Sequence, residues 1–424
     1  MATSAIILLE GHRSIGLPYV KAARRLGLHP ITMSADPTQY DYLAAEGTAV
    51  IHVDTEDLDA LIRECSRLYA TYDIAGITCL YESFYATVGK LCRHFDLPGP
   101  NPASIERCCD KFAQRQLLAE AGIPIPAYRV ATSATEVERS AAEIGLPVIL
   151  KPAVGSGSMG VRLCRNVDEL AKHTTYLLRG KQIWLSSPSI LVEEFTQGPF
   201  YSAEIMGHEV IAIGAADFGP PPHFVFNECI FPAPLTDVEY ARIAELSLSC
   251  LRALDLGWGP TNIEFRWTTR GPVVIEVNPR LAGGTTPQRF QLACGVDLIT
   301  EHIKLVIGEE WDLGKRHSYT AVTRYLLPDR DGILDRIGGD SRAAAVPGVA
   351  EVKLYVEPKT AVIRNGDYRD AIGYVIAASP DLAQTQAILQ RAVDLIDWSI
   401  TPFPTPDEQE QSAAPYFSAP TQVP

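Results

Sequence analysis

The chain has 424 residues, of which 46% are hydrophobic and 21% charged, an ordinary composition for a globular protein of about two to four domains. Its formal net charge of −14 argues against nonspecific nucleic-acid binding, because such binding requires a basic surface. The nine cysteines have no metal-binding spacing, no apolar run approaches the roughly 20 residues of a membrane span, and the start lacks the pattern of a signal peptide. We therefore predict a cytoplasmic protein with reduced thiols that binds neither nucleic acid nor a membrane.

Short apolar strands alternate with helical segments at the start of the chain. The predicted strands cover residues 5–9, 30–34, 50–53 and 74–79. Such alternation predicts a parallel sheet covered by helices on both faces, in a Rossmann-like domain over residues 1–100. Gly11 and Gly16 follow the first strand, but their spacing lacks the G-x-G-x-x-G fingerprint of dinucleotide sites. We expect a loop for another small ligand there, since ligands bind at the carboxyl ends of such strands.

Two lysines and a glycine-rich loop follow a proline-rich linker at residues 97–102. A predicted helix, ending near residue 122, carries Lys111. An apolar strand ends at Lys151, and a charge in that position indicates an anionic partner rather than an ordinary surface lysine. The three glycines of the next loop let its backbone N–H groups wrap phosphates. It is not a Walker P-loop, because Val161 and Arg162 stand where that motif requires Lys and Ser or Thr.

The next region predicts strands and one long covering segment. Residues 190–198 indicate a strand ending in a connection whose backbone could read a purine, and a strand at 201–206 follows. Residues 220–234 are rich in proline and predicted to be irregular, long enough to cover a substrate. We expect the substrate pocket to form from loops near residues 10–15, 81–83, 217–232 and 283–287.

A hairpin over residues 261–280 carries the strongest chemical signal. Apolar residues alternate with polar ones on both sides of a Thr-Arg-Gly-Pro turn, which predicts two antiparallel strands. If the strands pair symmetrically, Glu264 and Glu276 face each other with side chains roughly 5 Å apart. Asn278 adds an amide oxygen to the same face, and such a set of oxygens suits Mg²⁺. The alternative is a solvated face of a hairpin without a metal.

The pattern turns to strands again near the end of the chain. Strands are predicted at residues 321–327, 349–355 and 373–377, followed by a helix at 381–396. This segment is predicted to be an antiparallel sheet subdomain over residues 319–400. The remaining residues, 401–424, are rich in Pro, Ser, Thr, Gln and Glu, which is typical of a disordered tail.

Taken together, these motifs resemble the ATP-grasp superfamily, specifically carboxylate–amine ligases of the L-amino acid ligase (dipeptide synthetase) type, over about residues 5–400. The motifs that carry the resemblance are Ile149-Leu-Lys-Pro152 with its glycine loop, Val192-Glu-Glu-Phe195, Asn262-Ile-Glu-Phe265 and Ile275-Glu-Val-Asn-Pro-Arg280. The resemblance implies an α/β and α+β fold of three parts. They are a Rossmann-like domain at 1–100, an ATP-grasp domain at 101–318 with its lid at about 130–195, and the C-terminal sheet subdomain.

The resemblance also implies a nucleotide and metal site. The residues that would bind ATP are Lys111, Lys151, Ser156, Gly157, Ser158 and Met159 near the phosphates and Glu193, Glu194, Phe195 and Thr196 at an adenine hinge. Glu264, Glu276 and Asn278 would hold Mg²⁺, with Mn²⁺ as an alternative. Many members of the family have an acidic residue for the ribose where this chain has Phe200, so we expect Glu204 to take its place.

The resemblance further implies that Lys151 and Arg280 are catalytic. Arg280 would face the reacting carboxylate, and the substrate residues would be Glu228, Arg280, Gly283 and Gly284. The implied reaction joins a small-molecule acid to an amine through an acyl phosphate and releases ADP and phosphate. Two alternatives stay open: a ligase that uses bicarbonate or another small acid, and a non-catalytic nucleotide-binding sensor. Because dimers are common among similar ligases, a homodimer is also open.

Overall fold

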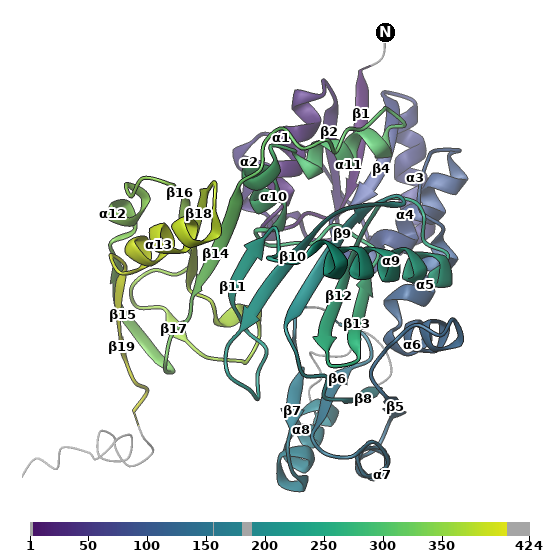
Figure 1. Ribbon diagram of the computed structural model, residues 1–424. Helices are drawn as coiled ribbons and strands as arrows, with labels where there is room; N and C mark the ends of the chain where they lie inside the picture. Colours follow the sequence, from purple (N-terminus) through teal and green to yellow (C-terminus); the bar gives the residue numbers. More distant parts are fainter. Residues whose placement is uncertain (1–2, 156, 180–188, 405–424) are drawn as a thin grey trace, which may run out of the picture.

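A computed structural model describes residues 3–155, 157–179 and 189–404 (Figure 1). The N-terminal part is a four-stranded parallel sheet in the order β3-β2-β1-β4. Its strands are β1 (Ser4–Leu9), β2 (His29–Ser34), β3 (Ala49–His52) and β4 (Asp73–Cys79), and its helices are α1 (Gly16–Arg25), α2 (Asp41–Ala45), α3 (Leu58–Tyr69) and α4 (Glu82–His94).

The central strand β1 is buried on both faces. Ile7 and Leu9 belong to one hydrophobic cluster, together with Leu61 of α3. Ile6 and Leu8 belong to another, together with Tyr19 of α1. Because successive side chains of a strand point to opposite faces, an uninterrupted apolar run is what a strand covered on both faces requires. The predicted parallel sheet is confirmed.

An eight-stranded antiparallel sheet forms the middle of the molecule and extends toward the C-terminal part (Figure 1). Its strands, in spatial order, are β13 (Gly271–Asn278), β12 (Pro260–Thr268), β9 (Phe200–Met206), β10 (Glu209–Phe218), β11 (Phe226–Phe231), β14 (Thr320–Leu326), β18 (Gly373–Ser379) and β16 (Val349–Leu354). The sheet therefore crosses residue 319 without interruption. The domain limits given above stay predictions.

Helices lie on both faces of this sheet. The helices are α9 (Asp237–Leu254), α10 (Thr286–Cys294), α11 (Leu298–Val306) and α13 (Leu382–Val393). Ile263 of β12 is buried in the cluster that includes residues of α9, and Val322 of β14 in the cluster that includes residues of α13. Phe290 of α10 packs instead with Ala321, which lies on the opposite side of β14. We call the two sides the α9 face and the α10 face.

The predicted irregular segment at residues 220–234 is wrong in its middle. Residues 226–231 form β11, which pairs with β10 on one side and β14 on the other. The prolines at both ends of the segment concealed the six-residue strand between them. Residues 226–231 are therefore part of the sheet and not a loop that covers a substrate.

A smaller four-stranded antiparallel sheet, in the order β5-β8-β6-β7, lies at the bottom of Figure 1. Its strands are β5 (Tyr128–Ala131), β6 (Val148–Pro152), β7 (Arg162–Cys164) and β8 (Ile190–Glu194), with helices α7 (Ala134–Ile144) and α8 (Val167–Arg179). Two helices precede it, α5 (Pro102–Cys109) and α6 (Lys111–Glu120), where one was predicted. Asp110 separates them because its side chain accepts hydrogen bonds from the N–H groups of Phe112 and Ala113 as the N-cap of α6.

The C-terminal part adds a three-stranded sheet that was not predicted, in the order β17-β15-β19. Its strands are β15 (Gly332–Gly338), β17 (Ala361–Val362) and β19 (Asp397–Thr401), and the short helix α12 (Asp340–Ala344) lies nearby. Most of the predicted tail, residues 405–424, lies outside the described residues. No helix in the described part of the chain is long and apolar enough to cross a membrane.

A buried histidine joins α11 to helix α1 of the N-terminal part. The Nδ1 atom of His302 lies 2.6 Å from the hydroxyl of Tyr19, and burial lowers the pKa of His302 to about 3. The folded protein therefore holds His302 neutral, whereas the unfolded chain protonates it below about pH 6.5. Since the unfolded state binds more protons in acid, this residue removes stability as the pH falls through the unfolded pKa.

We expect the free energy of unfolding of the wild type to fall by about 2 kcal/mol relative to the variant His302→Gln between pH 7.5 and pH 5. Urea unfolding of both proteins at the two pH values measures this difference. A difference between the two proteins that does not change with pH would show that folding does not lower the pKa of His302.

Candidate active site

The two acids of the hairpin face each other as predicted. In the ladder between β12 and β13, Glu264 lies directly opposite Glu276, and Asn262 lies opposite Asn278. The Nδ2 atom of Asn278 donates to Oδ1 of Asn262 at 3.3 Å. Because Glu264 and Asn262 alternate with the buried Ile263, these polar side chains lie on the α10 face of the sheet.

Lys111 reaches this pair of acids from the start of α6. Its Nζ atom lies 2.7 Å from Oε1 of Glu276 and donates to the carbonyl oxygen of Gly155 at 2.6 Å. Burial opposes the ionisation of Glu276, but the ammonium groups of Lys111 and Lys151 outweigh it and lower the pKa of that carboxyl group. Burial, together with the charge of Glu276, raises the pKa of Glu264 to about 7.

The pair therefore has the electrostatics of a cation site. One carboxylate is compensated by a lysine, and the other gains its proton near neutral pH unless positive charge approaches. Among the described residues no cluster of three or more His, Cys, Asp or Glu side chains forms. Two carboxylates and the Asn278 amide fit Mg²⁺, which keeps several positions for water and phosphate oxygens.

Lys151 occupies the end of β6 and is shared in an ion-pair network. Its Nζ atom lies 2.5 Å from one oxygen of Glu193, while Nε of Arg115 lies 2.7 Å from the other. Burial raises the pKa of Glu193, but Arg115 and Lys151 outweigh it, and the net shift is downward. Since two cations share one carboxylate, burial and the charge of Arg115 lower the pKa of Lys151. The network has two cations for one carboxylate, so it can also attract the negative charge of a phosphate.

The sequence analysis did not predict Arg115 as a residue of the site. It lies on α6 one helical turn after Lys111, so the same helix face carries both cations. That spacing of four residues was the available signal. Its side chain is buried and donates to the carbonyl oxygen of Ile275 as well as to Glu193.

Three residues of the predicted adenine hinge contact other side chains, and the fourth has a hydroxyl without a partner in the described structure. Glu193 is held by Lys151 and Arg115, and Glu194 accepts hydrogen bonds from the N–H of Ala127 and from Arg270. The Phe195 ring lies 6.4 Å from that of Phe224. Within the described structure, the hydroxyl of Thr196 is buried without a hydrogen-bond partner. Thr196 is the member of this segment with a free polar group.

Phe200 stands where the family has an acid, and the structure fills that place with an aromatic contact. The guanidinium of Arg266 lies 5.4 Å from the centre of the Phe200 ring and 5.1 Å from that of Phe218. Arg266 also donates to the carbonyl oxygen of Gly198 at 2.9 Å. A cation stacked on two rings is a stable arrangement without any carboxylate.

The expectation that Glu204 replaces the ribose acid is corrected. On β9, Phe200 lies opposite Arg266, and Glu204 lies opposite Asn262. Glu204 is thus four residues, or about 13 Å, farther along β9 than Phe200. It is also farther from the predicted hinge than Glu264 is. Its Oε1 atom accepts from Nδ2 of Asn262 at 2.8 Å, and burial raises its pKa to about 7.

Glu228 does not belong to the site, which corrects a second prediction. Its neighbour Ile230 packs with the cluster around α13, so the alternation of β11 turns Glu228 to the α9 face as well. There Arg324 lies 2.5 Å from Oε2 of Glu228, and Gln386 of α13 donates to Oε1 at 3.2 Å. Glu228 joins the sheet to α13 and points away from Glu264.

Arg280 connects the hairpin to the N-terminal domain. Its Nε atom lies 3.0 Å from Oε2 of Glu82, at the start of α4. The imidazole of His12, 4.7 Å from the ring of Tyr81, has its pKa lowered to about 4 by burial and by the charge of Arg280. The predicted pocket loops at residues 10–15 and 81–83 therefore do meet beside Arg280.

The glycine-rich segments lie at the edges of the site. Gly157 has a φ of +66°, and a side chain there would collide with the ring of Tyr368. Ser158 also has a positive φ, of +60°, and Met159 follows it. Ser156 lies outside the described residues. Gly283 and Gly284 follow Arg280, and a Cβ on Gly284 would lie 3.6 Å from the Tyr325 hydroxyl.

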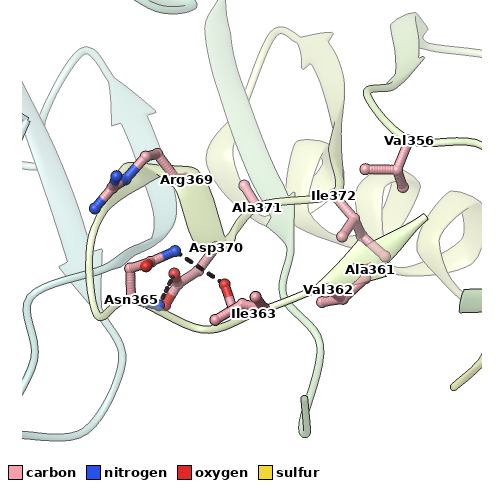
Figure 2. Close-up of a pocket in the computed structure, with 9 residues that line it drawn as sticks. All are labelled: Val356, Ala361, Val362, Ile363, Asn365, Arg369, Asp370, Ala371 and Ile372. Atoms are coloured by element: carbon pink, nitrogen blue, oxygen red, sulfur yellow. Dashed lines mark hydrogen bonds between the residues drawn. The ribbon is translucent and has the colours of Figure 1, made fainter. Parts of the chain in front are cut away.

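A cavity of about 240 Å³ lies elsewhere, in the C-terminal part (Figure 2). Aliphatic side chains such as Val356, Val362 and Ile372 line it, beside Arg369 and Asp370. Arg369 is paired with Asp367 at 2.6 Å, and Asp370 accepts from backbone N–H groups, as Figure 2 shows for Asn365. The cavity shares no residue with the predicted site.

Comparisons with known proteins match two parts of the chain to family models. The family model of the carbamoyl-phosphate synthase L chain, ATP binding domain, matches residues 110–313, and that of L-amino acid ligase C-terminal domain 2 matches residues 324–401. The uncharacterized protein y4rH of Sinorhizobium fredii is 63% identical over 413 residues, covering 97% of this chain and 86% of that protein. Human carnosine synthase 1 is 25% identical over 71% of this chain, which spans 39% of that protein's length.

Solved structures show the same fold. The L-amino acid ligase from Bacillus licheniformis has a TM-score of 0.79 at 18% identity, covering 95% of this chain and 100% of that one. The biotin carboxylase domain of Hydrogenobacter thermophilus 2-oxoglutarate carboxylase, in complex with MgADP, ADP and bicarbonate, has a TM-score of 0.67 at 18% identity, covering 94% and 91%. The predicted mixed α/β fold with an N-terminal parallel sheet is confirmed.

Proposed function

Since this chain belongs to the ATP-grasp superfamily of ligases, we propose that it joins a small carboxylic acid or amino acid to the amine of an amino acid. The reaction consumes ATP, passes through an acyl phosphate and releases ADP and phosphate. The observation that carries the proposal is the direct pairing of Glu264 with Glu276 on one sheet face, with Lys111 in contact with Glu276.

The cations around the hairpin support binding of a triphosphate. Lys111, Lys151 and Arg115 pair with Glu276 and Glu193, so three cationic side chains converge on these two carboxylates. Mg²⁺, held by Glu264, Glu276 and Asn278, would supply the charge that neutralises the transferred phosphoryl group. Lys111, which pairs with Glu276 at 2.7 Å, would lie close enough to the bound nucleotide for its ammonium group to contact a phosphate.

Arg280 is suited to the acid substrate. It lies two residues after Asn278 at the end of β13, and its partner Glu82 fixes the direction of its side chain. A guanidinium in this position can hold the carboxylate in line with the phosphate and then stabilise the oxyanion formed by attack of the amine. The glycine loop near Gly157 would exclude water, which otherwise hydrolyses an acyl phosphate.

The test is ADP release by the full chain with Mg²⁺ and pooled amino acids, followed by the mass of the product. We expect release that depends on particular pairs and a product mass equal to the two substrates minus one water. Release that requires bicarbonate instead would identify a carboxylase-type ligase, the reaction that the bicarbonate in the Hydrogenobacter structure suggests. Nucleotide binding without any release would contradict both and leave a sensor.

A further inference from the structure

Arg289 is a buried arginine that forms no salt bridge in the described part of the chain. It lies on α10, next to the predicted substrate segment at Gly283 and Gly284, and its exposed fraction is 8%. Its Nη2 atom donates to the hydroxyl of Thr286 at 2.8 Å, and its guanidinium contacts the thiol of Cys229. Its Nε is buried without a hydrogen-bond partner, and within the described structure Arg289 forms no ion pair.

The other arginines of this region behave differently. Arg115, Arg280 and Arg324 each lie within 3.0 Å of a carboxylate oxygen. A guanidinium stays charged at any pH a protein experiences, so a buried one requires an anion close by. Glu204 is the carboxyl group whose pKa the charge of Arg289 influences, but burial outweighs that influence and raises the pKa, and Glu204 already accepts a hydrogen bond from Asn262. Arg289 therefore has no carboxylate as a salt-bridge partner among the described residues.

The register of the sheet places Arg289 away from Glu264 and Glu276. Cys229, which Arg289 contacts, lies on β11, three strands from β12 and Glu264. At about 4.8 Å per strand, the backbone at Cys229 lies about 14 Å across the sheet from the backbone at Glu264. A carboxylate that receives phosphate must lie beside the metal-bound phosphates, so the anion at Arg289 is one that does not react.

The surroundings of Arg289 are polar and already ordered. The hydroxyl of Thr285 lies 3.0 Å from that of Thr323 and 3.5 Å from that of Tyr325, on the α10 face. These hydroxyls can donate to an anion held by the guanidinium. An amino acid that supplies its amine to the reaction keeps its own carboxylate free, and this is the anion that the site fits.

We propose that Arg289 binds the free carboxylate of the amino acid that supplies the amine. This inference rests on the proposed function and concerns one substrate of that reaction. Arg280 and Arg289 then divide the two carboxylates between them. Arg280 faces the one that is activated, and Arg289 holds the one that remains in the product.

The experiment compares each amino acid that serves as the amine with its α-amide, which lacks the carboxylate charge. The wild type, Arg289→Gln and Arg289→Lys are assayed by ADP release. We expect Arg289→Gln to raise KM for the amino acid at least about 10-fold, because charge-assisted hydrogen bonds are lost. KM for the amide should stay within about 2-fold, so the ratio of the two KM values falls toward one. Arg289→Lys, which keeps the charge, should retain part of the preference.

An unchanged ratio in Arg289→Gln, or a wild type that uses the amide as well as the amino acid, would overturn the inference. Arg252→Gln, an exposed arginine at the end of α9, is the matched control and should leave both KM values unchanged. If Arg289→Gln does not fold, the ratio measured with Arg289→Lys decides, since that variant keeps the buried charge.

Failure of the proposed function gives a different result. In that case the wild type releases no ADP with any pair. Calorimetric titration of the full chain with the 20 proteinogenic amino acids and their amides, with ATP present, then tests Arg289 without turnover. Amino-acid binding that weakens in Arg289→Gln supports the carboxylate site, and equal binding by both proteins, or none by the wild type, overturns it.

Discussion

Replacing Glu276 by glutamine is expected to lower kcat for ADP release at least about 100-fold, as the loss of one strong electrostatic stabiliser does. The change keeps the size of the side chain and removes the charge that faces Glu264 and pairs with Lys111. The measurement is steady-state ADP release at saturating ATP and Mg²⁺.

The control for this prediction is Glu143→Gln, which removes an exposed carboxylate paired with Arg129 of β5. It should leave kcat unchanged. A Glu276→Gln protein that releases ADP at a rate near that of the wild type would show that the opposed acids do not hold the metal.

Replacing Arg115 by leucine is expected to lower the free energy of unfolding by about 3 kcal/mol, because it leaves the Glu193 carboxylate buried with one cation instead of two. The side chain of Arg115 is 1% exposed, and it also donates to the carbonyl oxygen of Ile275, which would lose its partner. Urea unfolding followed by circular dichroism measures the change.

A double variant tests the cause. Adding Glu193→Gln to Arg115→Leu removes the uncompensated charge, so the double variant should be less destabilised than the sum of the two single variants. Arg129→Leu, at an exposed ion pair, should change stability little. Additive effects would show that Arg115 contributes by packing alone.

The hairpin shows how far sequence patterns reach. The period of two and the turn residues predicted two paired strands that bring Glu264 and Glu276 close together. The exact pairing came from the structure, because Thr268 pairs with Gly271 and a register shift between Glu264 and Phe265 then brings Glu276 opposite Glu264. In the same way the uninterrupted apolar run at residues 5–9 indicated a strand buried on both faces.

Glu228 and Glu204 show what the sequence patterns do not determine. A strand's alternation says which residues share a face, but it does not say which face meets the active site. Glu228 lies opposite Asp217 on β10 and Arg324 on β14, and Glu204 lies opposite Asn262 on β12. Pairing with distant strands decided that Glu228 faces α13 and that Glu204 lies past Glu264.

The sequence by itself determined the N-terminal strands, the hairpin that carries Glu264 and Glu276, and the lysines that precede it, because these depend on local period and turn chemistry. Only the tertiary structure decided that Arg115 shares Glu193 with Lys151, that Arg280 meets Glu82, and that Arg289 forms no ion pair with any residue of the described ranges. Those facts depend on residues far apart in the chain coming into contact. Partners of a buried charge are chosen by packing in three dimensions, which local sequence does not encode.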